Sequence, residues 1–279
     1  MINGKTKVLC LIGKPVKHSL SPIIHNVALN DLNLNYVYVA FEIEENQLEN
    51  AIKGIKALGI KGANVTMPYK TEVFKYLDEL SEDAKEIGAV NTILNEDGVL
   101  KGYNTDGIGA LRALEKFTEL DDKKVILLGA GGAAKAIAVT ISKKISEITI
   151  LNRTERKAVE IALKLKEKGF NAKALKLNSK NLRNEIKSAH ILINATSVGM
   201  NSNESPVPKH LLKPGLVVFD IVYSPLETKL LKNAREKDCI TIDGLWMLIY
   251  QGAESFKIWT GFYPNVQLMR DAALKMVRK

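Results

Sequence analysis

A glycine-rich turn in the middle of the chain has the composition of a nucleotide site. Residues 129–134, GAGGAA, follow the apolar run KVILL directly and precede a helical pattern. Glycines permit a tight turn and let backbone N–H groups approach a pyrophosphate, and the N-terminus of the next helix favours negative charge. This order predicts a dinucleotide site. Its expected residues are Gly129, Ala130, Gly131, Gly132, Ala133 and Ala134.

The residues after the next expected strand indicate which dinucleotide binds. An NAD site usually carries Asp or Glu there, which binds the ribose hydroxyls. This chain instead has Asn152, Arg153 and Thr154, followed by Arg156 and Lys157. An acid would repel a 2′-phosphate, whereas guanidinium groups pair with phosphate oxygens. We therefore predict NADP, and it stays open whether Arg156 or Lys157 joins Arg153 at the phosphate.

A different set of polar residues lies in the N-terminal part of the chain. The stretches KHSLSP at 17–22, NVTMPYK at 64–70 and YNTDGIG at 103–109 carry hydroxyls, amides, a lysine and a carboxylate. Taken singly, each has an ordinary structural interpretation: Ser21 is a good N-cap before a proline, and Asp106 is a good cap for the helix that follows. Only their combination points to chemistry.

The elements that must position these residues alternate between strands and helices along the chain. In the N-terminal part we expect strands at 7–12, 35–43 and 60–66, helices at 21–32 and 46–58, and a hairpin over 89–104 turned at Asp97-Gly98. Beyond a helix at about 107–118, the expected strands are continuous apolar runs at 124–128, 147–151, 190–194 and 216–220. Such runs are typical of a parallel sheet covered on both faces.

These patterns predict an α/β fold of two domains. The first is an N-terminal mixed-sheet α/β domain over 1–108. A Rossmann-type, doubly wound parallel-sheet domain over 109–244 would bind NADP. No strand is expected after residue 244, so the helices of 245–279 are expected to pack back onto the first domain.

Composition excludes several classes of protein. The 279 residues are 46% hydrophobic and 25% charged, as in an ordinary globular protein, and no apolar run is long enough to span a bilayer. The four histidines and two cysteines lack ligand spacing, so we expect no metal. The net charge of +9 raises nucleic acid as a partner, but the lysines alternate with glutamates without aromatic residues suited to base stacking. We expect a cytoplasmic protein that binds neither nucleic acid nor membrane.

Taken together, the motifs resemble those of shikimate dehydrogenases. The resemblance covers residues 19–251 and rests on SLSP, NVTMPYK, GAVNT, GYNTDG, GAGGAA, NRT, NATSVGM, DIVYSPLET and the Asp243-Gly244 pair before a helix with Gln251. It implies NADP-dependent, reversible reduction of 3-dehydroshikimate to shikimate in aromatic amino-acid biosynthesis. It also implies that the domain over 1–108 binds substrate and carries catalysis, with a cleft between it and the NADP domain, and that Lys70 and Asp106 form the catalytic acid–base dyad.

The resemblance further implies the residues that contact each ligand. Those expected to bind shikimate or 3-dehydroshikimate are Ser19, Ser21, Asn64, Thr66, Lys70, Asn91, Asp106, Tyr223 and Gln251. Those expected at the adenosine end of NADP are residues 129–134, Asn152, Arg153, Thr154 and Lys157, and those around the nicotinamide are Thr196, Ser197, Ile221, Gly244 and Met247.

Two alternatives to this function remain at this stage. One is a quinate/shikimate dehydrogenase of relaxed specificity that also uses NAD, against which Arg153 argues. The other is a non-catalytic sensor of the shikimate pathway, which could keep the serines and lose the dyad, whereas this chain has both Lys70 and Asp106. For the assembly, a homodimer is an open alternative to a single copy.

Overall fold

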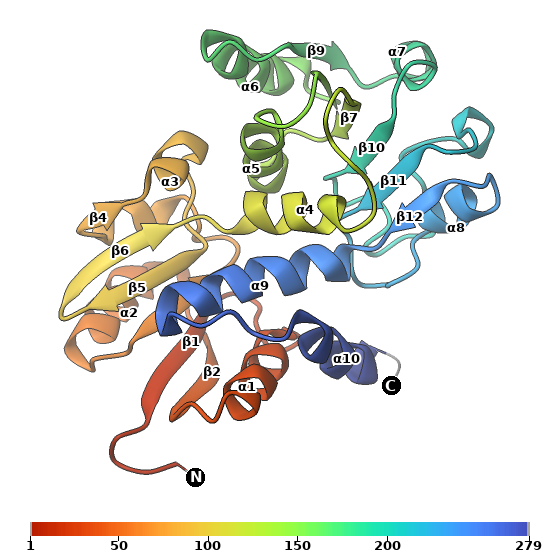
Figure 1. Cartoon of the computed structure of the whole chain (residues 1–279). Coiled ribbons are helices and arrows are strands. Elements are labelled where there is room, and N and C mark those ends of the chain that lie inside the picture. The colour runs from red at the N-terminus through yellow and green to blue at the C-terminus, as the bar shows by residue number, and fades with distance from the viewer. Residues whose placement is uncertain (1, 278–279) are drawn as a thin grey trace. The chain divides into compact units, whose positions relative to one another are not determined.

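The computed structural model describes residues 2–277, and it divides into two compact units (Figure 1). The first unit runs to Thr105 and resumes at Gln251, and the second unit comprises Asp106–Tyr250. Each unit contains one six-stranded sheet, the first mixed and the second parallel, which confirms the predicted α/β class. The domain boundaries expected from the sequence, 108/109 and 244/245, fall beside these positions. The cleft stays a prediction.

The sheet of the first unit has the strand order β2-β1-β3-β5-β6-β4. Strand β1 pairs in parallel with β2 and β3, β5 is antiparallel to both β3 and β6, and β4 is parallel to β6. The strands are β1 (Lys7–Gly13), β2 (Tyr36–Glu42), β3 (Gly62–Val65), β4 (Glu79–Leu80), β5 (Thr92–Glu96) and β6 (Val99–Tyr103).

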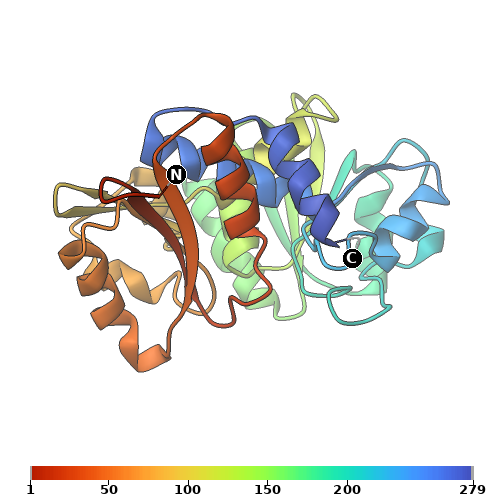
Figure 2. The same cartoon turned by 90° about the horizontal axis from the view of Figure 1, so that it is seen from below.

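Helices cover both faces of this sheet. The helices of this unit are α1 (Ser21–Asp31), α2 (Leu48–Ala57), α3 (Glu82–Ile87), α10 (Val266–Val277) and the part of α9 (Gly244–Thr260) that follows Tyr250, with short 3-10 turns η1 (Glu45–Gln47) and η2 (Glu72–Tyr76). In Figure 2 the red helix α1 and the orange helix α2 lie on opposite sides of the red strands β1 and β2. Because side chains alternate along a strand, Cys10 and Ile12 pack with Ile52 of α2, whereas Tyr38 stacks on His25 of α1 on the other face.

The start of α1 differs from the prediction that Ser21 is its N-cap. Leu20 holds that position, and Ser21 is the first helical residue, with Pro22 in the first turn as expected. The backbone N–H of Ser21 donates to Ser19 Oγ at 3.2 Å. Ser19 therefore satisfies one of the N–H groups at the helix start, and the helix begins without a capping bond from Ser21.

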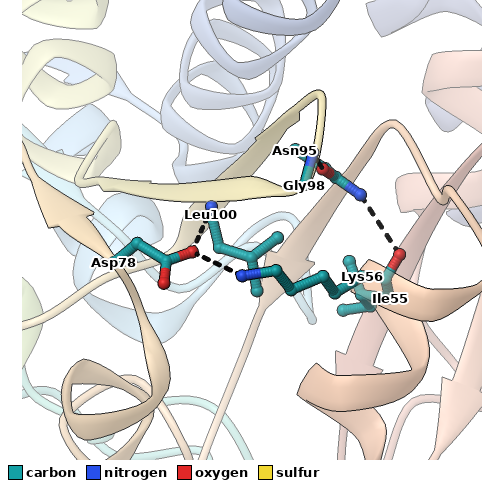
Figure 3. A network of polar contacts seen from close by, with 6 residues as sticks. All are labelled: Ile55, Lys56, Asp78, Asn95, Gly98 and Leu100. Atoms are coloured by element: carbon teal, nitrogen blue, oxygen red, sulfur yellow. Dashed lines mark hydrogen bonds and ion pairs between the residues drawn. The ribbon is translucent and has the colours of Figure 1, made fainter.

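The predicted hairpin is formed by β5 and β6. Its turn residues Asp97 and Gly98 both have positive φ, 52° and 90°, the backbone that a two-residue hairpin turn requires. The N–H of Gly98 donates to Asn95 Oδ1 at 2.9 Å, and Asn95 Nδ2 donates to the carbonyl oxygen of Ile55 in α2 at 3.2 Å (Figure 3). Asn95 thus connects the turn to α2.

Asp78 connects the same hairpin to α2 through a second set of hydrogen bonds. Its Oδ2 accepts from the N–H of Leu100 at 2.7 Å and from Lys56 Nζ at 3.2 Å (Figure 3). The backbone hydrogen bond, followed by the lysine, lowers the pKa of Asp78. Together these contacts hold the register in which Thr92 is paired with Tyr103.

The second unit is a doubly wound sheet with all its strands parallel. The order β12-β11-β10-β7-β8-β9 winds outward in both directions from β7, as in a Rossmann fold (Figure 1). The strands are β7 (Lys124–Leu128), β8 (Glu147–Asn152), β9 (Ala172–Lys176), β10 (Ile191–Asn194), β11 (Val217–Asp220) and β12 (Ile240–Ile242). The helices are α4 (Asp106–Glu115), α5 (Gly132–Ile141), α6 (Glu155–Glu167), α7 (Ser179–Ile186) and α8 (Lys229–Arg235), with the turn η3 (Lys209–Leu211).

Helix α9 (Gly244–Thr260) begins in the second unit and ends in the first. Helix α10 follows it and packs against α1 within the first unit. Between residues 2 and 277, no helix combines the length and the apolar character needed to cross a membrane. The same part of the chain holds no group of three or more His, Cys, Asp or Glu side chains arranged to bind a metal ion.

Candidate active site

The glycine-rich turn leaves β7 at the carboxyl edge of the parallel sheet, where ligands bind in such folds. Gly129 has a φ of 105°, and its N–H donates to the carbonyl oxygen of Leu151 at 2.8 Å. A Cβ atom at Gly129 would lie 2.7 Å from the carbonyl oxygen of Ala195. Both the backbone conformation and the close approach therefore require glycine here.

Gly131 and Gly132 have the opposite surroundings. Gly131 is the N-cap of α5, Gly132 is its first residue, and a Cβ at either position would meet no protein atom within 4 Å. The first turn of α5 carries no acidic side chain, and Ala134 is fully buried. Open space above unpaired N–H groups at a helix N-terminus suits a pyrophosphate, so these residues fit the predicted dinucleotide.

The loop after β8 presents cations to the solvent. Asn152 Nδ2 donates to the carbonyl oxygen of Thr154 at 2.9 Å, which fixes the turn, and Arg153 is exposed. Arg156 pairs with Glu160 one helical turn along α6, at 3.5 Å, whereas Lys157 is exposed and forms no ion pair within residues 2–277. Among the cations that follow β8 at 153–157, Arg153 and Lys157 are therefore the two that form no ion pair within the described residues.

A buried carboxylate connects the loops after β10 and β11. Asp220, fully buried at the end of β11, accepts hydrogen bonds from Asn194 Nδ2 at 2.9 Å, Thr228 Oγ1 at 2.6 Å and the N–H of Val222 at 3.1 Å. Burial raises the pKa of Asp220 from its ordinary 3.8 to about 6, although these hydrogen bonds lower it. Asn194 and Asp220 are register partners on neighbouring strands.

The same pair of residues orders the segments expected around the nicotinamide. Asn194 Oδ1 accepts from Thr196 Oγ1 at 2.6 Å and from the Thr196 N–H at 3.1 Å, and the Ile221 N–H donates to the Asn194 carbonyl oxygen at 3.0 Å. A Cβ at Gly244 would lie 2.3 Å from the carbonyl oxygen of Ile221, so α9 starts in direct contact with this loop. Thr196, Ile221 and Gly244 are thus gathered by Asn194 and Asp220. Ser197 is exposed beside Thr196, and Met247 is buried in the first turns of α9.

Sequence reasoning assigned no role to Asn194 and Asp220, although both begin motifs that carry the family resemblance. A signal was available, because each polar residue ends an otherwise apolar run of an expected parallel strand. Buried polar groups at neighbouring strand ends are expected to pair.

In the first unit, Asn64 lies on the face of the sheet that meets α1 and α9. It is the register partner of Thr92, and both side chains are buried. Asn64 Oδ1 accepts from Tyr38 Oη at 2.8 Å, and its Nδ2 donates to the carbonyl oxygen of Asn91 at 3.0 Å. The amide of Asn64 is therefore held at both ends.

Asn91 brings residues from distant parts of the sequence together. Its Oδ1 accepts from the N–H of Thr105 at 2.8 Å, and its Nδ2 approaches Gln251 Oε1 at 3.3 Å. Asn64, Asn91 and Gln251, three of the predicted substrate residues, are thus gathered in one region of the first unit.

Thr66 and Lys70 lie on the loop that follows β3. The N–H of Thr66 donates to the carbonyl oxygen of Ile12 at 3.0 Å, and the carbonyl oxygen of Lys70 accepts from the N–H of Val90 at 2.7 Å. A Cβ at Gly13 would lie 2.1 Å from Thr66 Cγ2, so the ends of β1 and β3 are in close contact. The loop that carries Lys70 is anchored at both its ends.

Ser19 and Ser21 follow β1 at the start of α1. Ser19 is half-buried and Ser21 is buried, and the 11-residue helix has no acidic side chain in its first turn. Hydroxyls beside a helix N-terminus suit a carboxylate group.

The two remaining predicted substrate residues, Asp106 and Tyr223, belong to the second unit. Asp106 begins α4 directly after Thr105. A Cβ at Gly107 would lie 2.0 Å from Thr140 Oγ1 and 2.6 Å from the carbonyl oxygen of Ala136, so α4 packs closely on α5 beside Asp106. Tyr223 follows β11, and burial raises the pKa of its hydroxyl.

The second unit is therefore a dinucleotide-binding module of the Rossmann type, and it is joined to a mixed-sheet unit with a polar site for a small molecule. Comparisons with known proteins identify this combination. Residues 11–93 match the family model of the shikimate dehydrogenase substrate binding domain, residues 112–245 that of shikimate / quinate 5-dehydrogenase, and residues 244–274 that of the shikimate 5'-dehydrogenase C-terminal domain. The chain belongs to the shikimate dehydrogenase family, as the motifs predicted.

Individual relatives match over almost the whole chain. The shikimate dehydrogenase (NADP(+)) of Pyrococcus furiosus is 56% identical over 279 residues, which cover 100% of this chain and 99% of the relative. A crystal structure of shikimate dehydrogenase in complex with NADP+ has a TM-score of 0.93 at 48% identity and covers 100% of this chain and 98% of that one. The shikimate 5-dehydrogenase of Listeria monocytogenes in complex with shikimate and NAD has a TM-score of 0.92 at 41% identity, with 97% of each chain covered.

Proposed function

We propose that this protein catalyses the NADP-dependent, reversible reduction of 3-dehydroshikimate to shikimate. The observation that carries this proposal is the 56% identity to a shikimate dehydrogenase (NADP(+)) over both units. The geometry of the second unit supports the dinucleotide, and the cluster of amides and hydroxyls in the first unit supports a small polyhydroxylated acid.

At the cofactor end, the chain's own residues would hold the phosphate groups of NADP in two places. The N–H groups at Gly131 and Gly132 would bind the pyrophosphate, since the glycines leave open space where a side chain would stand at the start of α5. Arg153 and Lys157 would bind the 2′-phosphate, because Arg156 is already paired with Glu160. When bound, NADPH supplies the hydride that the reduction requires.

At the substrate end, Ser19 and Ser21 would bind the carboxylate beside the N-terminus of α1. The amides of Asn64, Asn91 and Gln251, with the Thr66 and Tyr223 hydroxyls, would contact the ring hydroxyls. Neutral hydrogen-bonding groups discriminate strongly in favour of a polyol, because an analogue lacking one hydroxyl leaves a buried partner unpaired.

Lys70 and Asp106 would move the proton. During reduction, the ketone carbon gains a hydride and its oxygen gains a proton from the Lys70 ammonium, which becomes a neutral amine. During oxidation, the amine takes the hydroxyl proton back. The Asp106 carboxylate would orient the ammonium and accept a hydrogen bond from a ring hydroxyl.

The test measures shikimate oxidation through the absorbance of NADPH or NADH, with NADP and NAD supplied in parallel. We expect turnover with NADP, a much lower kcat/KM with NAD, and loss of turnover in Lys70→Ala. No turnover of shikimate would contradict the proposal and favour a sensor. The same assay with quinate in place of shikimate separates a strict shikimate dehydrogenase from a relaxed quinate/shikimate enzyme.

Two finer expectations belong to this proposal, a cytoplasmic location and a homodimer as the candidate assembly. Sedimentation velocity of the purified protein distinguishes a dimer from a single copy. Fractionation of the source cells tests the location.

A further inference from the structure

A cluster of buried hydroxyl groups lies behind the predicted substrate residues of the first unit. Ser255 in α9 is fully buried, and its Oγ lies 2.7 Å from Thr92 Oγ1 in β5 and 3.1 Å from Thr105 Oγ1, just after β6. None of these three residues belongs to the predicted site. Three separate elements of the unit nevertheless meet at their hydroxyls.

The side chain of Asn91 closes these contacts into a ring. Thr92 Oγ1 donates to Asn91 Oδ1 at 2.9 Å, and Asn91 Nδ2 donates to Thr105 Oγ1 at 2.9 Å. The orientation of the amide is fixed, because the backbone N–H of Thr105 donates to Asn91 Oδ1 at 2.8 Å, and only an oxygen can accept there.

The single proton of each hydroxyl determines the direction of the ring. Thr92 gives its proton to Asn91, so in the 2.7 Å contact Ser255 has to be the donor. Thr105 Oγ1 lies 3.2 Å from Asn91 Oδ1 and 3.1 Å from Ser255 Oγ. Because Asn91 Oδ1 already accepts two shorter hydrogen bonds, we assign the proton of Thr105 to Ser255. Ser255 Oγ also lies 3.0 Å from the carbonyl oxygen of Gln251, which is the more distant acceptor. Every member therefore donates once and accepts once around the ring, an arrangement in which hydrogen bonds strengthen one another.

The ring controls groups that face the predicted substrate site. With one N–H of Asn91 Nδ2 used by Thr105, the other is directed to Gln251 Oε1, 3.3 Å away. The Gln251 amide therefore turns its oxygen toward Asn91 and its Nε2 donor to the other side. Asn64 Nδ2 also reaches Ser255 Oγ at 3.2 Å, so the hydroxyl of Ser255 contacts a second predicted substrate residue directly.

We propose that Ser255 is a positioning residue, which through this ring holds the amide of Asn91 and thereby sets the donor and acceptor pattern that Gln251 and Asn64 present to the hydroxyl groups of the substrate. The inference rests on the proposed function, because it names what holds the predicted substrate residues in place. Ser255 itself touches neither the substrate nor the cofactor in this scheme.

The test removes single hydroxyls from the ring in the full-length enzyme. Ser255→Ala and Thr92→Val each delete one hydroxyl with little change of shape, and Thr92→Ser keeps it. We expect the first two variants to raise the KM for shikimate about fivefold, the effect of one lost hydrogen bond, with a smaller change in kcat and an unchanged KM for NADP. Thr92→Ser should retain the KM of the wild-type enzyme.

Thr149→Val is the matched control in the other unit. Thr149 is buried in β8 and donates from Oγ1 to Glu185 at 3.1 Å, so its substitution also removes a buried strand hydroxyl. We expect a comparable loss of thermal stability but no change in the KM for shikimate. The positioning role is overturned if Ser255→Ala leaves that KM unchanged or raises both KM values equally. It is also overturned if Thr92→Ser behaves like Thr92→Val. If the wild-type enzyme does not turn over shikimate, the proposed function fails first, and this inference fails with it.

Discussion

Replacing Asp220 with asparagine should change the way in which the stability of the protein depends on pH. The carboxyl is fully buried, and burial raises its pKa from 3.8 to about 6. Between these two pH values the folded protein binds a proton at Asp220, whereas the unfolded chain releases it. The contribution of Asp220 to the free energy of unfolding therefore falls as the pH rises through this window, and above pH 6 the ionised carboxylate is a constant penalty.

The size of this effect follows from the difference between the two pKa values. It corresponds to about 3 kcal/mol, most of which develops between about pH 4 and 7. Asparagine does not titrate, its oxygen can accept from Asn194 and from the Val222 N–H, and its nitrogen can face Thr228. The free energy of unfolding of Asp220→Asn minus that of the wild type should thus increase by about 3 kcal/mol from low to neutral pH.

Urea unfolding of both proteins across this pH range, followed by circular dichroism, measures the difference directly. Asp121→Asn, at an exposed carboxylate of the same unit, is the control for the loss of a negative charge alone. A difference between Asp220→Asn and the wild type that stays constant, or that falls as the pH rises, would refute the reasoning.

Three further predictions concern the proposed site and the core of the first unit. In steady-state assays, Lys70→Ala should lower kcat by roughly 10²-fold or more with a smaller change in the KM for shikimate. Asp106→Ala should both lower kcat and raise that KM. A near-normal kcat in Lys70→Ala would contradict the proton-transfer role. Arg153→Ala should weaken NADP binding in calorimetric titrations by about 1.5 to 3 kcal/mol and leave NAD binding nearly unchanged, and equal losses for both would indicate a folding defect instead. Burial lowers the pKa of His25 from 6.5 to about 3, so the contribution of His25 to wild-type stability should fall as the pH drops below 6.5, opposite in sign to the contribution of Asp220. His25→Leu should lose this part of the slope in urea unfolding, and an unchanged slope would mean that His25 takes up its proton while folded.

The strands that could be predicted from the sequence are those whose burial is continuous. Strands β7, β8, β10 and β11 lie inside the parallel sheet and are buried and mainly apolar, with most of their polar residues at the ends, so their runs at 124–128, 147–151, 190–194 and 216–220 were recognisable. The edge strand β9 was not predicted, because Ala172 is its only buried residue and Lys173 and Lys176 are exposed. Strand β12 at the opposite edge is three residues long and has one buried residue.

Sequence separation divides the parts of the site that were recognised from those that were missed. The glycine-rich turn and the cations after β8 are local patterns, readable within a few residues. Ser255 and Thr92 are 163 positions apart and meet only in the folded chain, so no sequence pattern indicated their contact. Ser21 was wrongly predicted as an N-cap, because the acceptor for its own N–H is supplied by Ser19, two residues earlier.

The passage of α9 from one unit to the other has a consequence for the order in which the chain matures on the ribosome. Residues 106–250 form one uninterrupted unit, which can fold as soon as it has been synthesised. One face of the first sheet has to wait, because Trp259 of α9 donates from Nε1 to the carbonyl oxygen of Ile93 at 2.8 Å and Ser255 fills the space beside Thr92. The core on the α2 side of the first sheet is built from residues 10–100 alone, whereas the face that α9 covers closes only when the last helices of the chain have emerged.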